Sequence, residues 1–304
     1  MSDARSPRHL QAGDTVRIVP TARAITAEEL AFGISTLESW GLQVELAENV
    51  GAKHFQSGGT DQERARAINQ ALQDKHVRAI WCARGGYGTV RTLDLIDAEA
   101  FKADPKWIVG FSDITALHNY ANQRGIMSLH AQMPFALDKK SPETLETLRK
   151  GLWGESFAIA TEPHPSNQQG EIEAELVGGN LSVLYSLRGS RHDLDVRDKI
   201  LFLEDLDELY YHVDRMFQNL KNSDWGVQVA GVIIGGMSDL WDKNEKDPFG
   251  VSVEDMVLDV FGGRSIPICF GFPSGHTADN QALVLGKKAK LSVGANDTKL
   301  SFNA

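Results

Sequence analysis

The stretch WIVGFSDITALHNY, residues 107–120, joins a strand pattern directly to a helix pattern with no loop between them. Residues 107–111 suit a buried strand, and an amphipathic helix pattern follows Ser112 and Asp113. A serine at so tight a junction is held out of the core with its hydroxyl exposed, and the next backbone N–H groups can bind a developing oxyanion. The junction suits a nucleophile. Serine and aspartate also cap helices, so a purely structural role stays open on this stretch alone.

The neighbouring sequence indicates a parallel sheet. From residue 14 to residue 135, short apolar runs alternate with helix patterns, which is typical of βαβ units. We expect strands at TVRIVP, LQVELAE, VRAIWCA, WIVGF and IMSLH. We expect helices over residues 27–40, 61–74, 87–97 and from Ser112 onward, the second of them opened by a capping box of Thr60 and Glu63.

A second domain is expected after a polar segment. Residues 137–170 are turn-rich and are predicted to link a domain over residues 1–136 to one over residues 171–304. In the latter we expect helices near residues 210–222 and 253–262, and strands at EIEAELVGG, KILFLEDL, QVAGVIIGGM, IPICFGF and QALVLGKKAKLSVG. This mixed pattern favours an α/β or α+β domain.

Composition and charge exclude several classes. The 304 residues are 42% hydrophobic and 24% charged, which is ordinary for a globular protein, and the net charge of −10 without a basic stripe argues against a nucleic-acid partner. The first residues lack the apolar core of a signal peptide, and no apolar run approaches the about 20 residues that span a bilayer. We therefore expect a cytoplasmic protein with no membrane partner.

Cysteine and metal chemistry are not indicated. Cys82 and Cys269 each lie in an apolar run and are interpreted as small core residues, with a catalytic thiol as the alternative. HExxH, CxxC and closely spaced histidine pairs are absent from the sequence. We expect neither a metal nor another cofactor.

A glycine-rich run, ARGGYG at residues 83–88, follows another predicted strand. The backbone of Gly85, Gly86 and Gly88 can approach a ligand closely, so their N–H groups could cradle an anion or complete an oxyanion hole. The alternative is a tight turn. The GxGxxG and Walker patterns are both absent.

A serine nucleophile needs a base and a group that orients the base. Of nine histidines, we favour His276 in the loop FGFPSGHTADN over His118, His130 and His212, although a loop histidine can be a solvated surface residue. Glu204 in ILFLEDLDE follows four apolar residues, and a carboxylate at the end of a core strand needs a partner. The alternative is a structural ion pair.

Taken in order, these motifs resemble one family over essentially the whole chain. The set comprises QSGGTDQERARAINQALQDKHVRAIWCARGGYGTVR, GFSDITALH, VGGNLSVLYSLRG, ILFLEDLDE with HVDRMFQNL, and FGFPSGH, and it resembles the LD-carboxypeptidases. The resemblance implies that Ser112 is the nucleophile, His276 the general base and Glu204 the residue that orients it. It also implies an oxyanion hole formed by the backbone N–H groups of Gly86 and Asp113.

The resemblance further implies a fold and an activity. The fold would be a doubly wound, Rossmann-like or flavodoxin-like parallel sheet carrying the serine, with a smaller mixed α/β C-terminal domain carrying Glu204 and His276, as a homodimer. The activity would be serine-type hydrolysis of the L–D bond that releases terminal D-alanine from murein tetrapeptides during cell-wall recycling. The VPTARA and HAQMP runs depart from the family's usual APS-type turn and HGPM-like run.

Substrate contacts and competing functions complete the expectations. Arg84 and the N–H groups near Gly85 are predicted to hold the terminal carboxylate of the substrate. One alternative is a microcin-immunity-type peptidase that cleaves peptidyl or aminoacyl nucleotides. Another is a two-domain small-ligand binding protein without catalysis.

Overall fold

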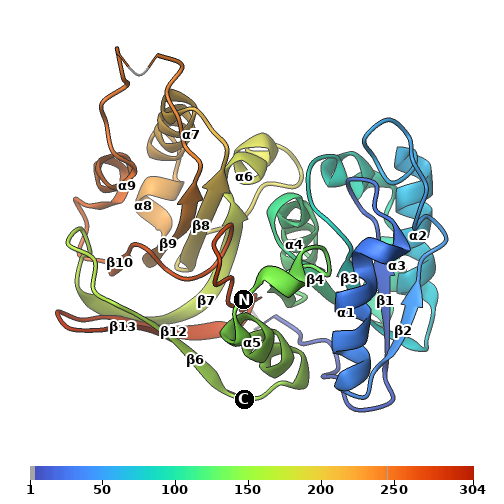
Figure 1. Ribbon diagram of the computed structural model, residues 1–304. Coiled ribbons are helices and arrows are strands. Elements are labelled where there is room, and N and C mark those ends of the chain that lie inside the picture. Colours follow the sequence, from blue (N-terminus) through green and yellow to red (C-terminus); the bar gives the residue numbers. More distant parts are fainter. Residues whose placement is uncertain (1–3, 245) are drawn as a thin grey trace. The chain divides into compact units, whose positions relative to one another are not determined.

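The computed structural model describes residues 4–244 and 246–304, which form two compact units. The first unit runs to Glu155 and also includes Ala278–Gly286, and the second unit comprises Ser156–Thr277 with Lys287–Ala304. Each unit is built on a sheet of its own (Figure 1).

The sheet of the first unit has the strand order β11-β5-β4-β3-β1-β2. All neighbours are parallel except β11, which runs antiparallel to β5 at one edge. Its strands are β1 (Thr15–Val19), β2 (Gln43–Leu46), β3 (Val77–Cys82), β4 (Trp107–Gly110), β5 (Ser128–His130) and β11 (Leu283–Leu285). Every residue of β4 and β5 is buried, as expected for strands covered on both faces.

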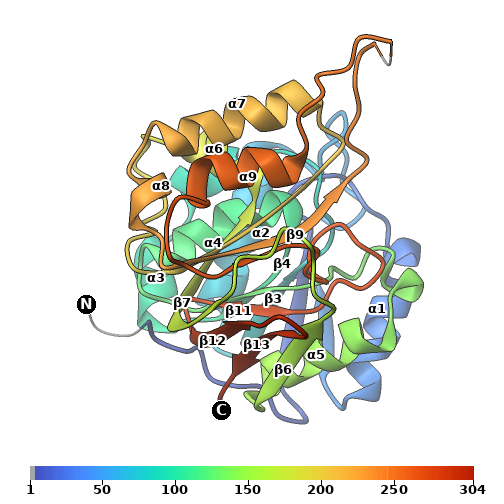
Figure 2. The ribbon, with the colours of Figure 1, turned by 90° about the vertical axis from the view of Figure 1, so that its left-hand side faces the viewer.

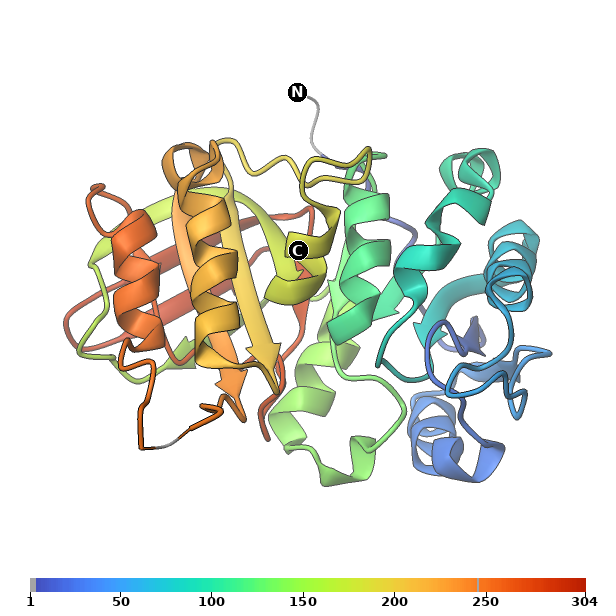
Figure 3. The ribbon, with the colours of Figure 1, turned by 90° about the horizontal axis from the view of Figure 1, so that it is seen from above.

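Helices cover both faces of this sheet. Figure 3 shows α1 and α5 on one face and α2, α3 and α4 on the other. The helices are α1 (Ala27–Ser39), α2 (Asp61–Gln73), α3 (Ala98–Ala103), α4 (Thr115–Asn122) and α5 (Pro142–Trp153), with 3₁₀ turns η1 (Thr89–Leu95), η2 (Ser112–Ile114) and η3 (Leu137–Lys139). The α-helix expected over residues 87–97 is instead the 3₁₀ turn η1, because its β-branched start, Thr-Val-Arg-Thr, has low helix propensity.

The second unit holds a mixed sheet with the order β10-β9-β8-β7-β12-β13-β6. Its β7–β10 part is parallel, and the rest is antiparallel. The strands are β6 (Phe157–Thr161), β7 (Gly170–Asn180), β8 (Ile200–Leu206), β9 (Gly231–Ser238), β10 (Ile268–Cys269), β12 (Lys288–Val293) and β13 (Thr298–Phe302).

An apolar core joins these parallel strands to their helices. Figure 2 shows α6 (Leu181–Leu187), α7 (Tyr210–Lys221) and α9 (Val253–Phe261) together over this part of the sheet, with the short α8 (Trp225–Gln228) beside them. Phe217, Leu203 and Ile234 are buried members of this core, one from a helix and two from strands. The helices expected near residues 210–222 and 253–262 are confirmed.

One expected strand is divided between the units. The run QALVLGKKAKLSVG was expected as one strand, but it breaks at Gly286, which has φ +86°. The LVL part is continuously apolar and forms the buried edge strand β11, whereas KAKLSV alternates exposed and buried residues and forms β12. Different hydrophobic periods on either side of the glycine explain the division.

The expected linker is also structured. Residues 137–170 contain η3, α5 and β6, and the boundary between the units falls at residues 155/156. Ser141 caps α5, Pro142 occupies its first turn, and Leu148 and Leu152 are buried on it. A polar composition therefore concealed an amphipathic helix. Residues 278–286, which we had placed in the C-terminal domain, belong to the first unit.

The fold class predicted from the sequence is confirmed: an α/β chain with an N-terminal doubly wound parallel sheet and a second mixed α/β unit. Within residues 4–244 and 246–304, none of the helices has the length and apolar character needed to cross a membrane.

A buried histidine fixes the carboxyl end of β4. His118 on α4 is 1% exposed, and its Nε2 lies 2.8 Å from the carbonyl oxygen of Gly110 while its Nδ1 lies 2.9 Å from Ser128 Oγ. A carbonyl oxygen can only accept, so Nε2 carries a proton and donates it to Gly110. Burial lowers the pKa of His118 to about 4.

This histidine predicts a pH dependence of stability. The unfolded chain protonates His118 near pH 6.5, whereas the folded chain does so only near pH 4. Between these values the unfolded state binds more protons, so the free energy of unfolding falls as the pH is lowered, by at most about 3 kcal/mol. Urea unfolding at pH 7 and pH 4.5 should show this loss in the wild type and a smaller loss in His118→Gln.

The exposed His76 provides the matched control. His76→Gln should follow the wild-type pH dependence. A parallel loss of stability in the wild type and in His118→Gln would show that His118 does not titrate as described.

Candidate active site

Ser112 occupies a strained turn between β4 and α4. Its φ is +64°, in the left-handed region that residues other than glycine rarely adopt, and the residue is 9% exposed. Such a conformation costs about 1–3 kcal/mol and persists where the surroundings impose it, often at functional sites. The strand-to-helix turn expected from the sequence is therefore present, and it holds Ser112 in the geometry of a nucleophile elbow.

The glycine-rich loop lies against this serine. A Cβ placed on Gly85 would lie 3.2 Å from Ser112 Cβ and 3.3 Å from Ser112 Oγ. Gly86 follows with φ +119°, a conformation that favours glycine. The structure therefore brings Gly85 and Ser112 into contact, although residues 85 and 112 are far apart in the sequence.

The aspartate after the serine supports the loop with its side chain. Asp113 is 2% exposed, and its Oδ2 accepts a hydrogen bond of 2.9 Å from the backbone N–H of Thr89. Burial raises the pKa of Asp113, while hydrogen bonds from Thr89 and Gly88 and the charge of Arg64 oppose that rise. The sequence analysis gave Asp113 either a helix-capping role or a backbone role in the oxyanion hole, so the contact of its side chain with Thr89 was missed.

Arg64 is the second support that the sequence interpretation missed. It is 1% exposed, and its Nη1 donates to the carbonyl oxygens of Thr21 at 2.6 Å and Gly88 at 2.8 Å. Its Nη2 donates to Asp61 Oδ1 at 2.5 Å. The available signal was its place on the apolar stripe of α2 together with Ile68. A charged residue on an apolar stripe must find polar partners.

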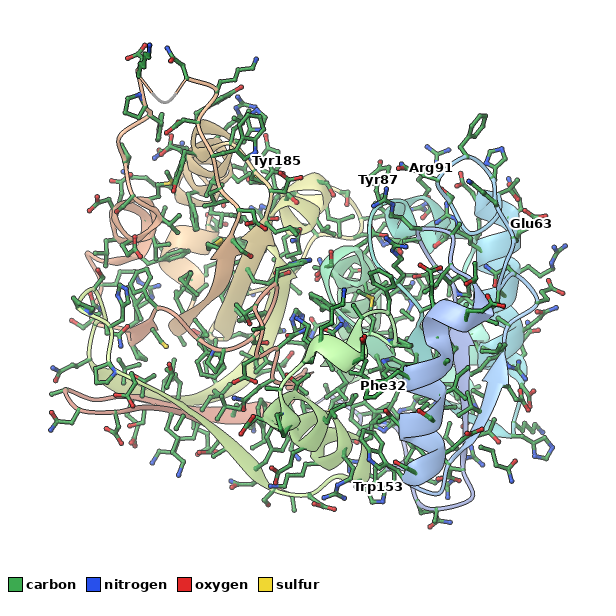
Figure 4. The ribbon with its side chains drawn as sticks, viewed as in Figure 1. Phe32, Glu63, Tyr87, Arg91, Trp153 and Tyr185 are labelled. Carbon is green, nitrogen blue, oxygen red and sulfur yellow. The ribbon has the colours of Figure 1, made fainter. Side chains whose placement is uncertain are left out.

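Arg84 is already engaged within the first unit. Its Nη1 lies 3.6 Å from Glu29 Oε1, and its guanidinium lies 4.0 Å from the centre of the Phe135 ring. Its role in holding a substrate carboxylate stays a prediction. Further along the same loop Tyr87 is 58% exposed, and Figure 4 shows it near Arg91 at the same end of the unit.

Glu204 and His276 form a pair in the second unit. Glu204 is fully buried near the end of β8, and its Oε2 lies 2.6 Å from His276 Nδ1 and 3.3 Å from the His276 backbone nitrogen. Nδ1 therefore donates to the carboxylate, which leaves Nε2 as the basic nitrogen of the ring. The sequence analysis expected Glu204 to need a partner, and His276 is bonded to it.

Local packing fixes the turn that carries His276. Gly275 has φ +99°, and a Cβ at this position would lie 2.7 Å from Glu204 Cβ, so only glycine allows the turn to approach the carboxylate. Ser238 Oγ donates to the His276 carbonyl oxygen at 2.6 Å. His276 is therefore held by one hydrogen bond to its ring and another to its backbone carbonyl.

The next residue, Asp205, was not singled out from the sequence. It is 1% exposed and accepts hydrogen bonds from Asn180 Nδ2 at 2.9 Å and from the Ser182 N–H at 2.8 Å. Burial, together with the neighbouring Glu204, raises the pKa of Asp205 to about 7. These contacts tie the end of β8 to the start of α6.

The other candidates have different surroundings. His118 bonds to Gly110 and Ser128 as described, and His130 is fully buried on β5. His212 Nδ1 lies 3.2 Å from Glu208 Oε2 on the surface of α7. Cys82 and Cys269 are buried free thiols, and burial raises the pKa of each to about 12, which opposes thiolate formation.

Each unit holds groups of the kind that acyl transfer uses. The first unit carries a serine on a strained elbow beside a glycine-rich loop, and the second unit carries an imidazole oriented by a buried carboxylate. Over residues 4–244 and 246–304, no group of three or more His, Cys, Asp or Glu side chains is placed to hold a metal ion.

Comparison with known proteins identifies the family. The model of the LD-carboxypeptidase N-terminal domain matches residues 16–131, and that of the LD-carboxypeptidase C-terminal domain matches residues 173–291. A Bacillus subtilis relative, a probable murein peptide carboxypeptidase, is 33% identical and is matched over 94% of this chain and 91% of its own length.

Two further relatives extend the comparison. The crystal structure of a muramoyltetrapeptide carboxypeptidase from Oxalobacter formigenes superposes with a TM-score of 0.86 at 26% identity, covering 95% of this chain and 99% of that one. The microcin C7 self-immunity protein MccF of Escherichia coli is 26% identical over 96% of this chain and 94% of its own length. With both domain models matched in order and full-length relatives found, the chain belongs to the LD-carboxypeptidase family.

Proposed function

We propose that the chain is a serine-type LD-carboxypeptidase that hydrolyses the L–D peptide bond and releases terminal D-alanine from murein tetrapeptides. The observation that carries the proposal is the pair of Glu204 and His276, joined at 2.6 Å, in a chain whose Ser112 is held at φ +64° beside a glycine-rich loop. The names of the Bacillus and Oxalobacter relatives support a murein peptide as substrate.

In the proposed first step, Ser112 Oγ attacks the carbonyl carbon of the L–D bond and its proton passes to His276 Nε2. Glu204 keeps the ring in the required tautomer and stabilises the imidazolium that forms. The N–H groups of Gly86 and Asp113 bind the oxyanion of the tetrahedral intermediate. The intermediate then collapses to an acyl-enzyme, and D-alanine leaves with the proton held by His276.

The second half of the reaction reverses these roles. His276 Nε2 removes a proton from water, and the resulting hydroxide attacks the ester carbonyl of the acyl-enzyme. Collapse of this second intermediate returns the proton to Ser112 Oγ and frees the tripeptide. No cofactor takes part in the proposed steps. The family resemblance also underlies our proposal that the enzyme works as a homodimer in the cytoplasm on peptides from recycled cell wall.

A second candidate activity is the cleavage of peptidyl or aminoacyl nucleotides. The similarity to MccF along nearly the whole chain favours testing it. An assay that follows D-alanine release from the tetrapeptide can include an aminoacyl sulfamoyl nucleoside as a second substrate. A kcat/KM for the nucleoside well above that for the tetrapeptide would favour the second candidate, and binding of the tetrapeptide without D-alanine release would favour a binding protein.

Ser112→Ala should abolish D-alanine release while the protein stays folded. If serine, histidine and glutamate act as a unit, kcat should fall by on the order of 10⁶-fold. Ser112→Gly is a matched variant, because glycine adopts φ +64° without strain. It should be equally inactive and about 1 kcal/mol more stable than Ser112→Ala. Turnover above a tenth of wild type in either variant would end the assignment of Ser112 as the nucleophile.

Glu204→Gln tests the orienting role of the carboxylate. A glutamine at this position favours the wrong histidine tautomer, so kcat should fall by about 10⁴-fold while the melting temperature changes little. Glu254→Gln is the matched control, because Glu254 pairs with His164 at 3.8 Å near the surface, and it should leave kcat unchanged. A much lower melting temperature with near-normal kcat in Glu204→Gln would make Glu204 a structural residue.

A further inference from the structure

We propose that Arg23 binds the C-terminal carboxylate of the substrate, an inference that rests on the carboxypeptidase function proposed above. Arg23 lies in the VPTARA run that follows β1, one of the two places where the sequence departs from the family's usual pattern. It was not among the residues singled out from the sequence. Three features support the role. Arg23 packs against the glycine-rich loop, its guanidinium forms no ion pair with the residues that the structure describes, and Arg84 is already paired with Glu29.

Arg23 packs against the glycine-rich loop that contacts Ser112. Its backbone N–H donates to the Gly85 carbonyl oxygen at 3.4 Å, and its backbone forms a bridge with Ser57 on the other side. A Cβ placed on Gly86 would lie 2.4 Å from Arg23 Cγ and 2.5 Å from Arg23 Cδ, so the aliphatic stem of Arg23 covers Gly86. Gly85 in turn contacts Ser112. The backbone and aliphatic stem of Arg23 are therefore anchored on Gly85 and Gly86, and Gly85 contacts the proposed nucleophile.

The charge of Arg23 is not neutralised. Arg23 is exposed, and among residues 4–244 and 246–304 no carboxylate forms an ion pair with it. Its neighbours differ: Arg64 and Arg91 both pair with Asp61. The chain has a net charge of −10. In such a chain, an unpaired arginine whose stem packs over the glycine-rich loop is suited to binding an anionic ligand.

The chemistry of a carboxypeptidase requires such a ligand. A guanidinium presents a planar fork of N–H donors that matches the two oxygens of a carboxylate, and packing of the stem lowers the entropy lost on binding. Arg84 is less suited to the role, because a substrate carboxylate would have to displace Glu29 from it. We therefore assign the terminal carboxylate to Arg23 in place of Arg84.

The test combines two substrates with four variants. The substrates are the murein tetrapeptide with a free C-terminal D-alanine and the same peptide ending in D-alaninamide. The enzymes are the wild type, Arg23→Gln, Arg23→Lys, Arg84→Gln and Arg197→Gln, of which the last removes an exposed arginine of the second unit as a control. The rate at which D-alanine or D-alaninamide is released gives kcat/KM for each combination of enzyme and substrate.

The wild type should prefer the acid to the amide by about 100-fold, since hydrogen bonds between charged groups are the strong ones. Arg23→Gln should lose about 100-fold on the acid and almost nothing on the amide, so its preference should fall close to one. Unchanged cleavage of the amide also shows that the variant is folded. Arg23→Lys should be intermediate, and Arg84→Gln and Arg197→Gln should keep the wild-type preference.

Several outcomes would overturn the inference. Full preference for the acid in Arg23→Gln would do so, and loss of preference in Arg84→Gln alone would return the carboxylate to Arg84. A wild type that cleaves both peptides equally would refute the carboxylate contact and leave the peptidase function standing. A wild type that cleaves neither peptide would refute the proposed function itself, and the inference with it.

Discussion

A serine held at φ +64° between a buried strand and a helix is the constraint on which the first unit depends. A conformation that costs about 1–3 kcal/mol persists only when packing enforces it. Three buried side chains hold the surrounding backbone: His118 bonds to Gly110, Asp113 to the first residue of η1, and Arg64 to Gly88. Each of these polar groups is buried, so each is costly unless its partners are in place. The strained turn at Ser112 and the buried side chains that hold it therefore depend on one another.

In the second unit, too, a buried polar group needs its partner in place, and here the two residues are Glu204 and His276. A fully buried Glu204 needs a hydrogen-bond donor, and His276 supplies both its ring Nδ1 and its backbone N–H. Gly275 lets the turn approach closely enough for both contacts. The interaction that offsets the cost of burying the carboxylate also fixes the tautomer of the imidazole.

Much of this site could be predicted from the sequence, because its signals are local. A strand that runs directly into Ser112, glycines after β3 and a carboxylate at the end of β8 are each visible within about ten residues, a window in which periodicity is informative. The missed features depend on distant partners. Arg64 bonds to Thr21 and Gly88, and β11 pairs with β5 although over 150 residues separate them. Local patterns show that a buried charge or an apolar run needs a partner, but not which partner it finds.

The central claim is that an acyl group passes through Ser112, and partitioning with hydroxylamine tests it most directly. Murein tetrapeptides ending in D-alanine or in D-serine are hydrolysed in the presence of hydroxylamine, and the tripeptide hydroxamate and free tripeptide are measured by mass spectrometry. If both substrates pass through one acyl-enzyme, the ratio of hydroxamate to tripeptide is the same for the two leaving residues. Undiminished hydrolysis without hydroxamate, or a ratio that changes with the leaving residue, would contradict the account.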